Sequence, residues 1–291
     1  MNDTLILGDR AYSSWSLRAW LLFSRFGLPA RTRFVGFLDA SVAEQLADQS
    51  PARTVPTLLT GEGAVIWDSL AIAEGLADRH PDAGLWPGDP LARATARSLA
   101  AEMHSGFAAL REACPMNLRR AYADVPVPDA VAADLRRIET IWAHARAVCG
   151  GAGPWLCGGY SVADAFYAPV AARIAGYGLA VSDAAAAYVA AHLADPAFRR
   201  WRAMALVEGP DLPWYAQDHA AAPWPGPAPE DAAAADGPSV NDACPYSGQP
   251  VSHYLRYRGR VWGFCNAFCR DKTAADPAAW PAFQAMVAAA R

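Results

Sequence analysis

The first eighty residues alternate between strand and helix patterns, and this alternation constrains the fold more than any other feature of the chain. Short apolar or alternating runs predict strands, and an amphipathic run that stops at Gly27 predicts a helix after the first strand. A second helix begins at Asp68 and Ser69 and ends before Pro81. The order is βαβ followed by ββα, which predicts a small α/β domain. The expected strands span residues 4–8, 31–37, 55–59 and 64–67, and the expected helices include residues 17–26 and 69–79.

The rest of the chain divides by composition. Residues 91–206 show only helical periodicity, interrupted by proline and glycine, and one helix opens with Ser161 and an acid, Asp164, three residues on. A Pro/Ala-rich stretch follows that is typical of an extended linker, and the last segment is too short to be stable comfortably on its own apolar core. We therefore expect domains at 1–82 and 90–215, a linker at 216–240 and a small module at 241–291.

Charge and hydropathy exclude some classes of protein. The 291 residues carry a net charge of -4, with no long basic run, which argues against a nucleic-acid-binding protein. Charged residues, glycine or proline interrupt every apolar run before it could span a membrane. The start, MNDTLILGDR, lacks the pattern of a signal peptide, so we expect a cytoplasmic protein.

Four short motifs follow one another along the predicted α/β unit and the helical block. They are SSWSLR at 13–18, TVPTL at 54–58, DSLAI at 68–72 and SVAD at 161–164. With the βαβββα order, they make residues 1–215 resemble the glutathione transferase superfamily. The resemblance implies a thioredoxin-like first domain, an all-helical second domain, glutathione as co-substrate and a homodimer.

The same resemblance implies roles for individual residues. SSWSLR is similar to the serine-type motif of zeta-like members, which makes Ser13 the first candidate for the catalytic serine, Ser14 the second, and Arg18 a further catalytic candidate. TVPTL resembles the family's cis-proline loop, and DSLAI resembles the start of its γ-glutamyl-binding helix. Trp15 stands where the zeta-like motif has cysteine, which weakens the case for that class's isomerase chemistry.

Each motif also has a physical rationale. A serine at a helix N-terminus can donate a hydrogen bond to a thiolate, and the helix dipole favours the same negative charge. A cis bond before Pro56 would turn the backbone of Val55 toward a cysteinyl backbone. Asp68 and Ser69, at the start of a helix, could hold the amino group and the carboxylate of a γ-glutamyl group.

Simpler structural roles account for the same residues. The serines could be helix caps only, Pro56 could be trans, and Arg18 could be a solvated helix residue. The stretch EMHSGF at 102–107, with Arg111 and PMN at 115–117 after it, resembles a bacterial subgroup, and the resemblance implies that this helix flanks the second-substrate pocket. Its candidate pocket residues are His104, Arg111 and Asn117, although His104 and Arg111 could equally well only join helices.

Three cysteines crowd into the last fifty residues. Cys244, Cys265 and Cys269 follow a C-x20-C-x3-C pattern that could converge on one zinc ion and stabilise a small fragment. The segment from Cys244 to Trp280 resembles the YHS/TRASH family of metal-associated modules. It also predicts two strands at 254–257 and 261–264 and a helix after Cys269. The fourth ligand is open between Asp271, His253, Asp242 and water, and three reduced, buried thiols are the alternative.

We therefore expect a glutathione transferase that activates the thiol for attack on a small electrophile. The expected fold class is a thioredoxin-like α/β domain plus an all-α domain, followed by an α+β zinc-type module. A non-catalytic glutathione- or metal-sensing protein is one alternative, and a glutathione-dependent isomerase or dehalogenase is another.

Overall fold

The structure, a computed structural model, describes residues 3–38 and 40–290 and divides into two compact units. The first unit comprises residues 1–193 and 211–225, and the second comprises residues 194–210 and 226–291. The outermost residues of the expected domains, 1 and 291, lie outside the described residues. The division differs from the expected boundaries, because helix α9 (Pro196–Val207) belongs to the second unit and not to the helical domain.

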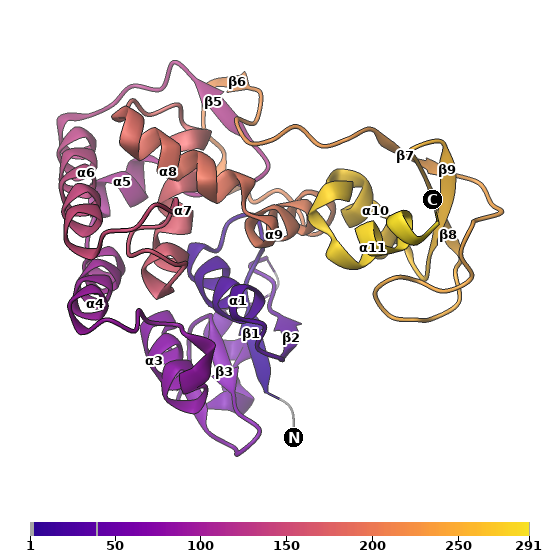
Figure 1. The fold of residues 1–291 in the computed structure, drawn as a ribbon, viewed down its shortest axis with the longest axis horizontal. Coiled ribbons are helices and arrows are strands. Elements are labelled where there is room, and N and C mark those ends of the chain that lie inside the picture. Colours follow the sequence, from indigo (N-terminus) through magenta and orange to yellow (C-terminus); the bar gives the residue numbers. More distant parts are fainter. Residues whose placement is uncertain (1–2, 39, 291) are drawn as a thin grey trace. The chain divides into compact units, whose positions relative to one another are not determined.

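A four-stranded mixed sheet forms the centre of the N-terminal domain (Figure 1). Its strands are β1 (Thr4–Leu7), β2 (Arg31–Phe34), β3 (Thr57–Leu59) and β4 (Val65–Trp67), in the order β2-β1-β3-β4. β1 pairs in parallel with β2 and antiparallel with β3, as a βαβ unit followed by a hairpin requires. These strands confirm the expected α/β order, although β2 ends three residues earlier than expected.

The two helices expected in this domain are both present. Helix α1 (Ser14–Phe26) ends at Gly27, whose φ of 66° places it in the left-handed region that glycine adopts readily. Helix α3 (Ser69–Arg79) contacts α1 and both hairpin strands. A short helix α2 (Val42–Gln45), which the sequence did not predict, starts with a Ser41–Glu44 capping box.

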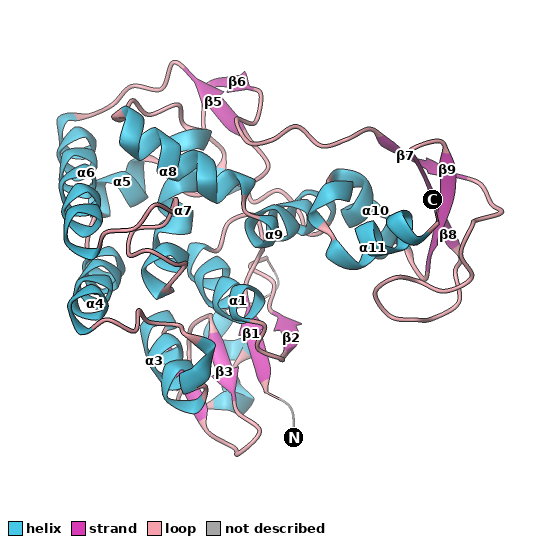
Figure 2. Cartoon of the chain, in the orientation of Figure 1, coloured by secondary structure: helices cyan, strands magenta, loops and turns pink. Residues whose placement is uncertain are grey.

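Five helices build most of the second domain (Figure 2). They are α4 (Pro90–Ser105), α5 (Ala108–Ala113), α6 (Asp129–Cys149), α7 (Val162–Gly176) and α8 (Asp183–Ala194). Helix α7 is buried along nearly its whole length and contacts both α1 and α4, so it fastens the helical domain to the N-terminal domain. Asp164 accepts hydrogen bonds from the backbone N–H of Ser161 at 2.9 Å and from its hydroxyl at 3.1 Å, as the SVAD motif predicts.

Two parts of the middle of the chain contain short strands that the sequence did not predict. Within the all-helical block lies a strand, β5 (Ala121–Ala123), which pairs with β6 (Ala220–Ala222) from the expected linker. A second part of that linker forms β7 (Ala232–Ala235), which pairs with β8 (His253–Tyr257). Backbone pairing therefore fixes alanine-rich segments that have little β-propensity of their own.

The second unit is an α+β fold with one antiparallel sheet, β7-β8-β9. Strand β9 (Arg260–Phe264) forms the expected hairpin with β8, and α10 (Ala267–Ala275) contacts all three strands and α9. Cys269 lies inside α10, so the helix begins earlier than expected. Helix α11 (Pro281–Ala289) completes the unit and buries Phe283. In the described part of the chain, no helix combines the length and the apolar character that crossing a membrane would require.

Candidate glutathione site and cysteine cluster

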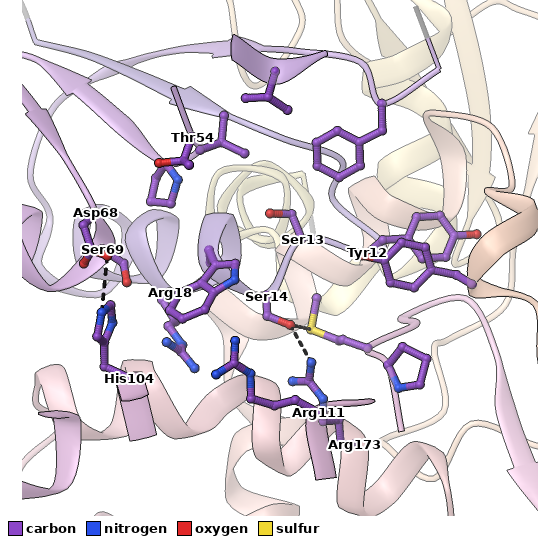
Figure 3. A pocket seen from close by; sticks show the side chains of 18 of the residues that line it. Tyr12, Ser13, Ser14, Arg18, Thr54, Asp68, Ser69, His104, Arg111 and Arg173 are labelled. Carbon is purple, nitrogen blue, oxygen red and sulfur yellow. Dashed lines mark hydrogen bonds and ion pairs between the residues drawn. The ribbon is translucent and has the colours of Figure 1, made fainter. Parts of the chain in front are cut away.

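The first unit contains a cavity of about 750 Å³ between the start of α1, the loop before β3, the start of α3 and helices α4, α5 and α7 (Figure 3). Its lining includes every residue that the sequence suggested for glutathione or its second substrate, except Asn117. The suggested residues that it brings together are Ser13, Ser14, Arg18, Val55, Pro56, Asp68, Ser69, His104 and Arg111.

The two candidate serines point to different sides of this cavity. Ser13 is the N-cap of α1: its hydroxyl accepts the Ser16 N–H at 3.3 Å and donates to the Ser16 Oγ at 2.9 Å. In Figure 3 this hydroxyl points toward the side of Thr54, whereas the Ser14 hydroxyl points toward Arg173. Arg173 donates to the Ser14 Oγ at 3.0 Å, and Ser14 donates to the Met116 sulfur at 3.7 Å.

At the start of α3, the Asp68 side chain forms hydrogen bonds, whereas the Ser69 side chain has no hydrogen-bond partner among the described residues. Asp68 is the N-cap, with a φ of 76° that L-residues rarely adopt, and its carboxylate accepts the Leu70 N–H at 2.8 Å. Its second oxygen lies 3.3 Å from the His104 Nε2. The Ser69 hydroxyl is buried and has no hydrogen-bond partner among the described residues. A buried, unsatisfied hydroxyl is costly, so it marks a position where a bound ligand would supply the partner.

The loop before β3 contributes backbone to the same cavity. The Val55–Pro56 peptide bond is cis, in agreement with the resemblance. The Thr57 hydroxyl donates to the Thr54 carbonyl at 2.7 Å, which ties the loop to the strand that follows it. Thr54, Val55 and Pro56 all line the cavity.

Asn117 does not line the cavity, so this geometry gives no support to its expected role in a substrate pocket. Its carbonyl oxygen accepts the Arg119 N–H at 3.0 Å, and its amide nitrogen lies 3.5 Å from the Tyr122 hydroxyl. The side chain is therefore occupied in the turn that leads into β5, where it satisfies buried polar groups.

Comparisons with known proteins agree with this geometry. Residues 12–79 match the family model described as glutathione S-transferase, N-terminal domain. A curated protein of Caenorhabditis elegans, named a probable maleylacetoacetate isomerase, is 37% identical over 98 residues, which are 34% of this chain. The match spans only 44% of that relative's own length.

Solved structures match a longer part of the chain. A glutathione transferase homolog from Burkholderia gl BGR1, crystallised with bound glutathione, has a TM-score of 0.52 and 24% identity, over 68% of this chain and 95% of its own. A glutathione transferase from Methylococcus capsulatus str. Bath has a TM-score of 0.52 and 21% identity, over 70% of this chain and 98% of its own. The chain has the glutathione transferase fold.

Within the glutathione transferase fold, Arg173 is the main lining residue that sequence reasoning missed. It is the only charged residue of α7 besides Asp164, in a helix that is otherwise apolar apart from tyrosine and glycine, and that isolation was the available signal. Burial, and then the nearby Arg111, lower its pKa to about 10, so it remains charged at neutral pH. Arg18 is also buried, and burial followed by the charges of Arg173 and Arg111 lowers its pKa to about 9.

The second unit brings the three cysteines of the C-x20-C-x3-C pattern together. The sulfurs of Cys244, Cys265 and Cys269 all lie within 4.8 Å of one another. Burial raises the pKa of the Cys244 thiol, but backbone N–H groups, including those of Cys265 and Tyr246, outweigh burial and lower it to about 7. Burial raises the pKa of Cys269 to about 12, although Lys272 opposes that shift.

Asp271 does not join this cysteine cluster. Its carboxylate instead accepts a hydrogen bond from the Arg270 Nε at 2.7 Å. Among the described residues, the group close enough to share one ion contains the three cysteines only. The expectation that Asp271 is a fourth ligand is therefore not met by the geometry. His253, another candidate, has its Nδ1 2.9 Å from the Ser252 hydroxyl.

Proposed function

We propose that the protein is a glutathione transferase that binds glutathione in the 750 Å³ cavity and activates its thiol for attack on an electrophile. The observation that carries this proposal is the Ser69 hydroxyl at the start of α3, which is buried and has no hydrogen-bond partner among the described residues. There the hydroxyl and the free N–H groups of the helix start can receive the γ-glutamyl carboxylate. The carboxylate of Asp68, next to it, can receive the ammonium group of the same ligand.

The cysteinyl residue and the thiol of glutathione can lie against the loop before β3 and the start of α1. The backbone of Val55 can pair with the cysteinyl residue in the manner of an added strand. That placement directs the thiol toward the start of α1, where Ser13 can turn its hydroxyl from Ser16 to the sulfur. The hydrogen bond and the helix dipole both favour the thiolate.

The chemical step then needs little from the protein beyond this arrangement. The thiol proton leaves to solvent, the sulfur forms a bond to the electrophilic carbon, and the leaving group departs with its electron pair. Proximity and the lowered thiol pKa supply the acceleration. The Burkholderia homolog was crystallised with bound glutathione, which supports glutathione as the ligand. At 24% identity, its similarity to this chain shows a shared fold only.

Calorimetric titration of glutathione into the full chain tests the proposal. We expect binding in the micromolar to low-millimolar range, and much weaker binding of cysteinylglycine, which lacks the γ-glutamyl group. Equal affinity for both ligands, or no binding of glutathione, would show that the start of α3 is not a γ-glutamyl site.

A second candidate function is a glutathione-dependent isomerase. The identity with the Caenorhabditis elegans relative favours it, while Trp15 in place of the zeta-like cysteine opposes it. In this case the thiolate adds to the substrate and leaves again, so glutathione is not consumed. Measurement of free thiol during turnover separates the two candidates, because only a transferase lowers the thiol concentration.

For the second unit we propose that Cys244, Cys265 and Cys269 hold a zinc ion, in line with the resemblance of this segment to YHS/TRASH modules. The spacing of the sulfurs and the lowered pKa of Cys244 support the proposal, because zinc binds thiolates. Metal analysis of purified protein is expected to give about one zinc per chain, and less than half an equivalent would contradict a structural zinc. A Cys265→Ser variant provides the control.

We also propose a homodimer, as the resemblance implies. An exposed Trp67 on β4 and an exposed Leu91 on α4 are apolar side chains that such an interface would cover. Light scattering of the full chain is expected to give twice the chain mass of 31.0 kDa.

A further inference from the structure

The cysteine cluster of the second unit carries an excess of negative charge when it holds a zinc ion. Cys244, Cys265 and Cys269 bind zinc as thiolates, so their three negative charges exceed the two positive charges of the ion by one. Cys244 and Cys269 are buried, and Cys265 is partly buried. Burial removes such a charge from water, so nearby hydrogen-bond donors and cations decide how well the site holds the ion.

Hydrogen-bond donors surround two of the three sulfurs. The Cys265 sulfur accepts hydrogen bonds from the Ser247 hydroxyl at 3.3 Å and from the Asn266 side-chain amide at 3.4 Å. Backbone N–H groups, including that of Ser247, donate to the Cys244 sulfur. Donors of this kind orient the ligands of a metal ion and stabilise their charge. The Cys269 sulfur has a cation beside it.

This cation is Lys272, the only lysine among the 291 residues. It follows Cys269 by three positions in α10, which places both side chains on the same face of the helix. Burial raises the pKa of the Cys269 thiol, and the positive charge of Lys272 opposes this rise. The Lys272 Nζ lies 4.1 Å from the ring centre of Tyr246, 4.3 Å from that of Trp280 and 5.3 Å from that of Phe268.

The three aromatic rings hold the ammonium group of Lys272 in a buried position. Lys272 is 9% exposed, although lysine is rarely buried without compensation for its charge. The faces of aromatic rings stabilise a cation. Tyr246 follows Cys244 by two residues, and the Trp280 Nε1 donates to the Lys272 carbonyl at 3.1 Å. The rings are thus fixed to the segments that carry the cysteines, and the ammonium group stays beside the cluster.

We propose that the buried ammonium group of Lys272 compensates the negative charge of the zinc-loaded cysteine cluster and so strengthens the binding of a divalent ion. This inference rests on the zinc site proposed above. Lys272 supplies the one positive charge that three thiolates and a zinc ion lack. The affinity therefore depends on the charge of the bound ion, because an ion with three positive charges neutralises three thiolates by itself and gains nothing from the lysine.

Substitution of Lys272 by methionine tests the proposal. Methionine keeps an unbranched apolar chain among the aromatic rings and removes the charge. Zinc displaces three thiol protons to the buffer when it binds, so the loaded cluster gains one negative charge. We expect Lys272→Met to weaken zinc binding about tenfold, the effect of one nearby charge in a largely buried site. Competition with a chromophoric chelator at fixed pH measures the affinity of the full chain, and an unchanged affinity would overturn the proposal.

Arsenite distinguishes a charge effect from a loss of structure. Arsenous acid reacts with three thiols, forms three arsenic–sulfur bonds and releases three water molecules, so the cluster gains no charge and no atom is oxidised or reduced. We expect calorimetry to give arsenite affinities that agree within about twofold for the wild-type chain and Lys272→Met. Equal losses of zinc and arsenite affinity would show that Lys272 only holds the cysteines in place, and would contradict the proposal.

Two further variants provide matched controls. Lys272→Arg keeps the positive charge and the aromatic contacts, and it should retain the zinc affinity within about threefold. Arg256→Met removes a positive charge from an exposed position on β8, paired with Val261 and not with the end of β9 that leads to Cys265. It should change the zinc affinity less than about twofold. In either variant, a loss as large as that of Lys272→Met would contradict the proposal.

Zinc binding by the wild-type chain separates this inference from the zinc site itself. If the wild-type chain does not bind zinc, the site is wrong and this inference fails with it. If the wild-type chain and Lys272→Met bind zinc equally well, the cysteines form the site and only the role of Lys272 fails. Weaker zinc binding by Lys272→Met with unchanged arsenite binding is the expected result.

Discussion

Two adjacent serines have different environments in this cavity, and the difference follows from helix geometry. Ser13 precedes the first turn of α1, so its oxygen accepts a backbone N–H while its hydrogen can still be redirected. Ser14 is the first helical residue, and its oxygen is held by Arg173. The sequence suggested both serines without distinguishing them physically. Their partners, from α1 and α7, depend on tertiary contacts that no local pattern contains.

Ser13→Ala is expected to raise the pKa of the thiol of bound glutathione by about one unit, the loss of one hydrogen bond to a charged group. The same substitution removes an N-cap and should lower the free energy of unfolding by about 1 kcal/mol. The ultraviolet absorbance of the thiolate as a function of pH measures the first effect. Ser14→Ala is the control; an equal or larger shift in that variant would make Ser14 the thiol partner.

Ser69→Ala is expected to weaken glutathione binding about tenfold, because a carboxylate loses a hydroxyl donor. The thiol pKa of bound glutathione should not change, since Ser69 is expected to contact the opposite end of the ligand. Calorimetry measures the affinity. Stability should stay the same or rise slightly, because the buried Ser69 hydroxyl has no hydrogen-bond partner to lose among the described residues. A drop in thermal stability with unchanged affinity would instead show that Ser69 serves only as a structural residue.

At the scale of elements, helix α8 contains a buried histidine that makes stability depend on pH. His192 is 1% exposed and lies against the rings of Tyr188 and Trp155 at 4.5 and 5.1 Å. Burial, and then the charge of Arg25, lower its pKa to about 3. The unfolded chain, with a pKa near 6.5, takes up a proton below that pH while the folded chain does not. The stabilisation is therefore complete above about pH 6.5 and is lost as the pH falls.

Because of this pH dependence, we expect the unfolding free energy of the wild-type chain to fall by about 2 kcal/mol between pH 7 and pH 5 through the titration of His192. His192→Phe keeps an aromatic ring but cannot titrate, so its unfolding free energy should change less over the same interval. Denaturant unfolding at the two pH values measures the difference. The buried Asp164, whose pKa is raised mainly by burial, is present in both proteins and cancels in the comparison. Parallel pH profiles would show that His192 does not titrate on unfolding.

Element boundaries were predictable where capping is local, and unpredictable where pairing is distant. Asp68 and Ser161 mark helix starts because an N-cap acts within three residues, and Gly27 ends α1 for the same local reason. Strand β5 pairs with β6 across about a hundred residues, and both are built largely from alanine. Neither composition nor periodicity indicates such a strand, because its stability comes from a partner that the local sequence does not contain.

At the scale of the whole molecule, the least predictable feature was where the second unit begins and ends in the sequence. The amphipathic pattern of α9 correctly indicates a helix, but not the surface on which its apolar face is buried. In the structure α9 contacts α10, and Arg199 forms a bidentate ion pair with Asp276 at 2.8 and 2.6 Å. Resemblance placed α9 in the helical domain, since a family pattern does not include contacts with an appended module. The cysteine module therefore includes a helix that precedes the linker.

This arrangement predicts that the C-terminal module cannot be removed without a loss of stability. A chain that ends at Tyr215 keeps α9 but loses α10, Asp276 and strand β6. The buried apolar residues of α9, including Trp201, would lose the contacts that the removed elements make with this helix, and Arg199 would lose its charged partner. We expect the melting temperature to fall by at least several degrees, because each kcal/mol is worth about 2–4 °C at this size.

Asp276→Asn in the full chain measures how much of this loss of stability comes from the ion pair alone. Both side chains of the pair are largely buried, so the substitution leaves Arg199 partly unpaired and is expected to cost about 3 kcal/mol. Arg97→Met, which breaks an exposed pair with Glu74, is the matched control and should cost less than about 1 kcal/mol. If the truncated chain melted at the same temperature as the full chain, α9 would be stable without the module. The second unit would then begin after the linker, as the amino-acid composition alone suggests.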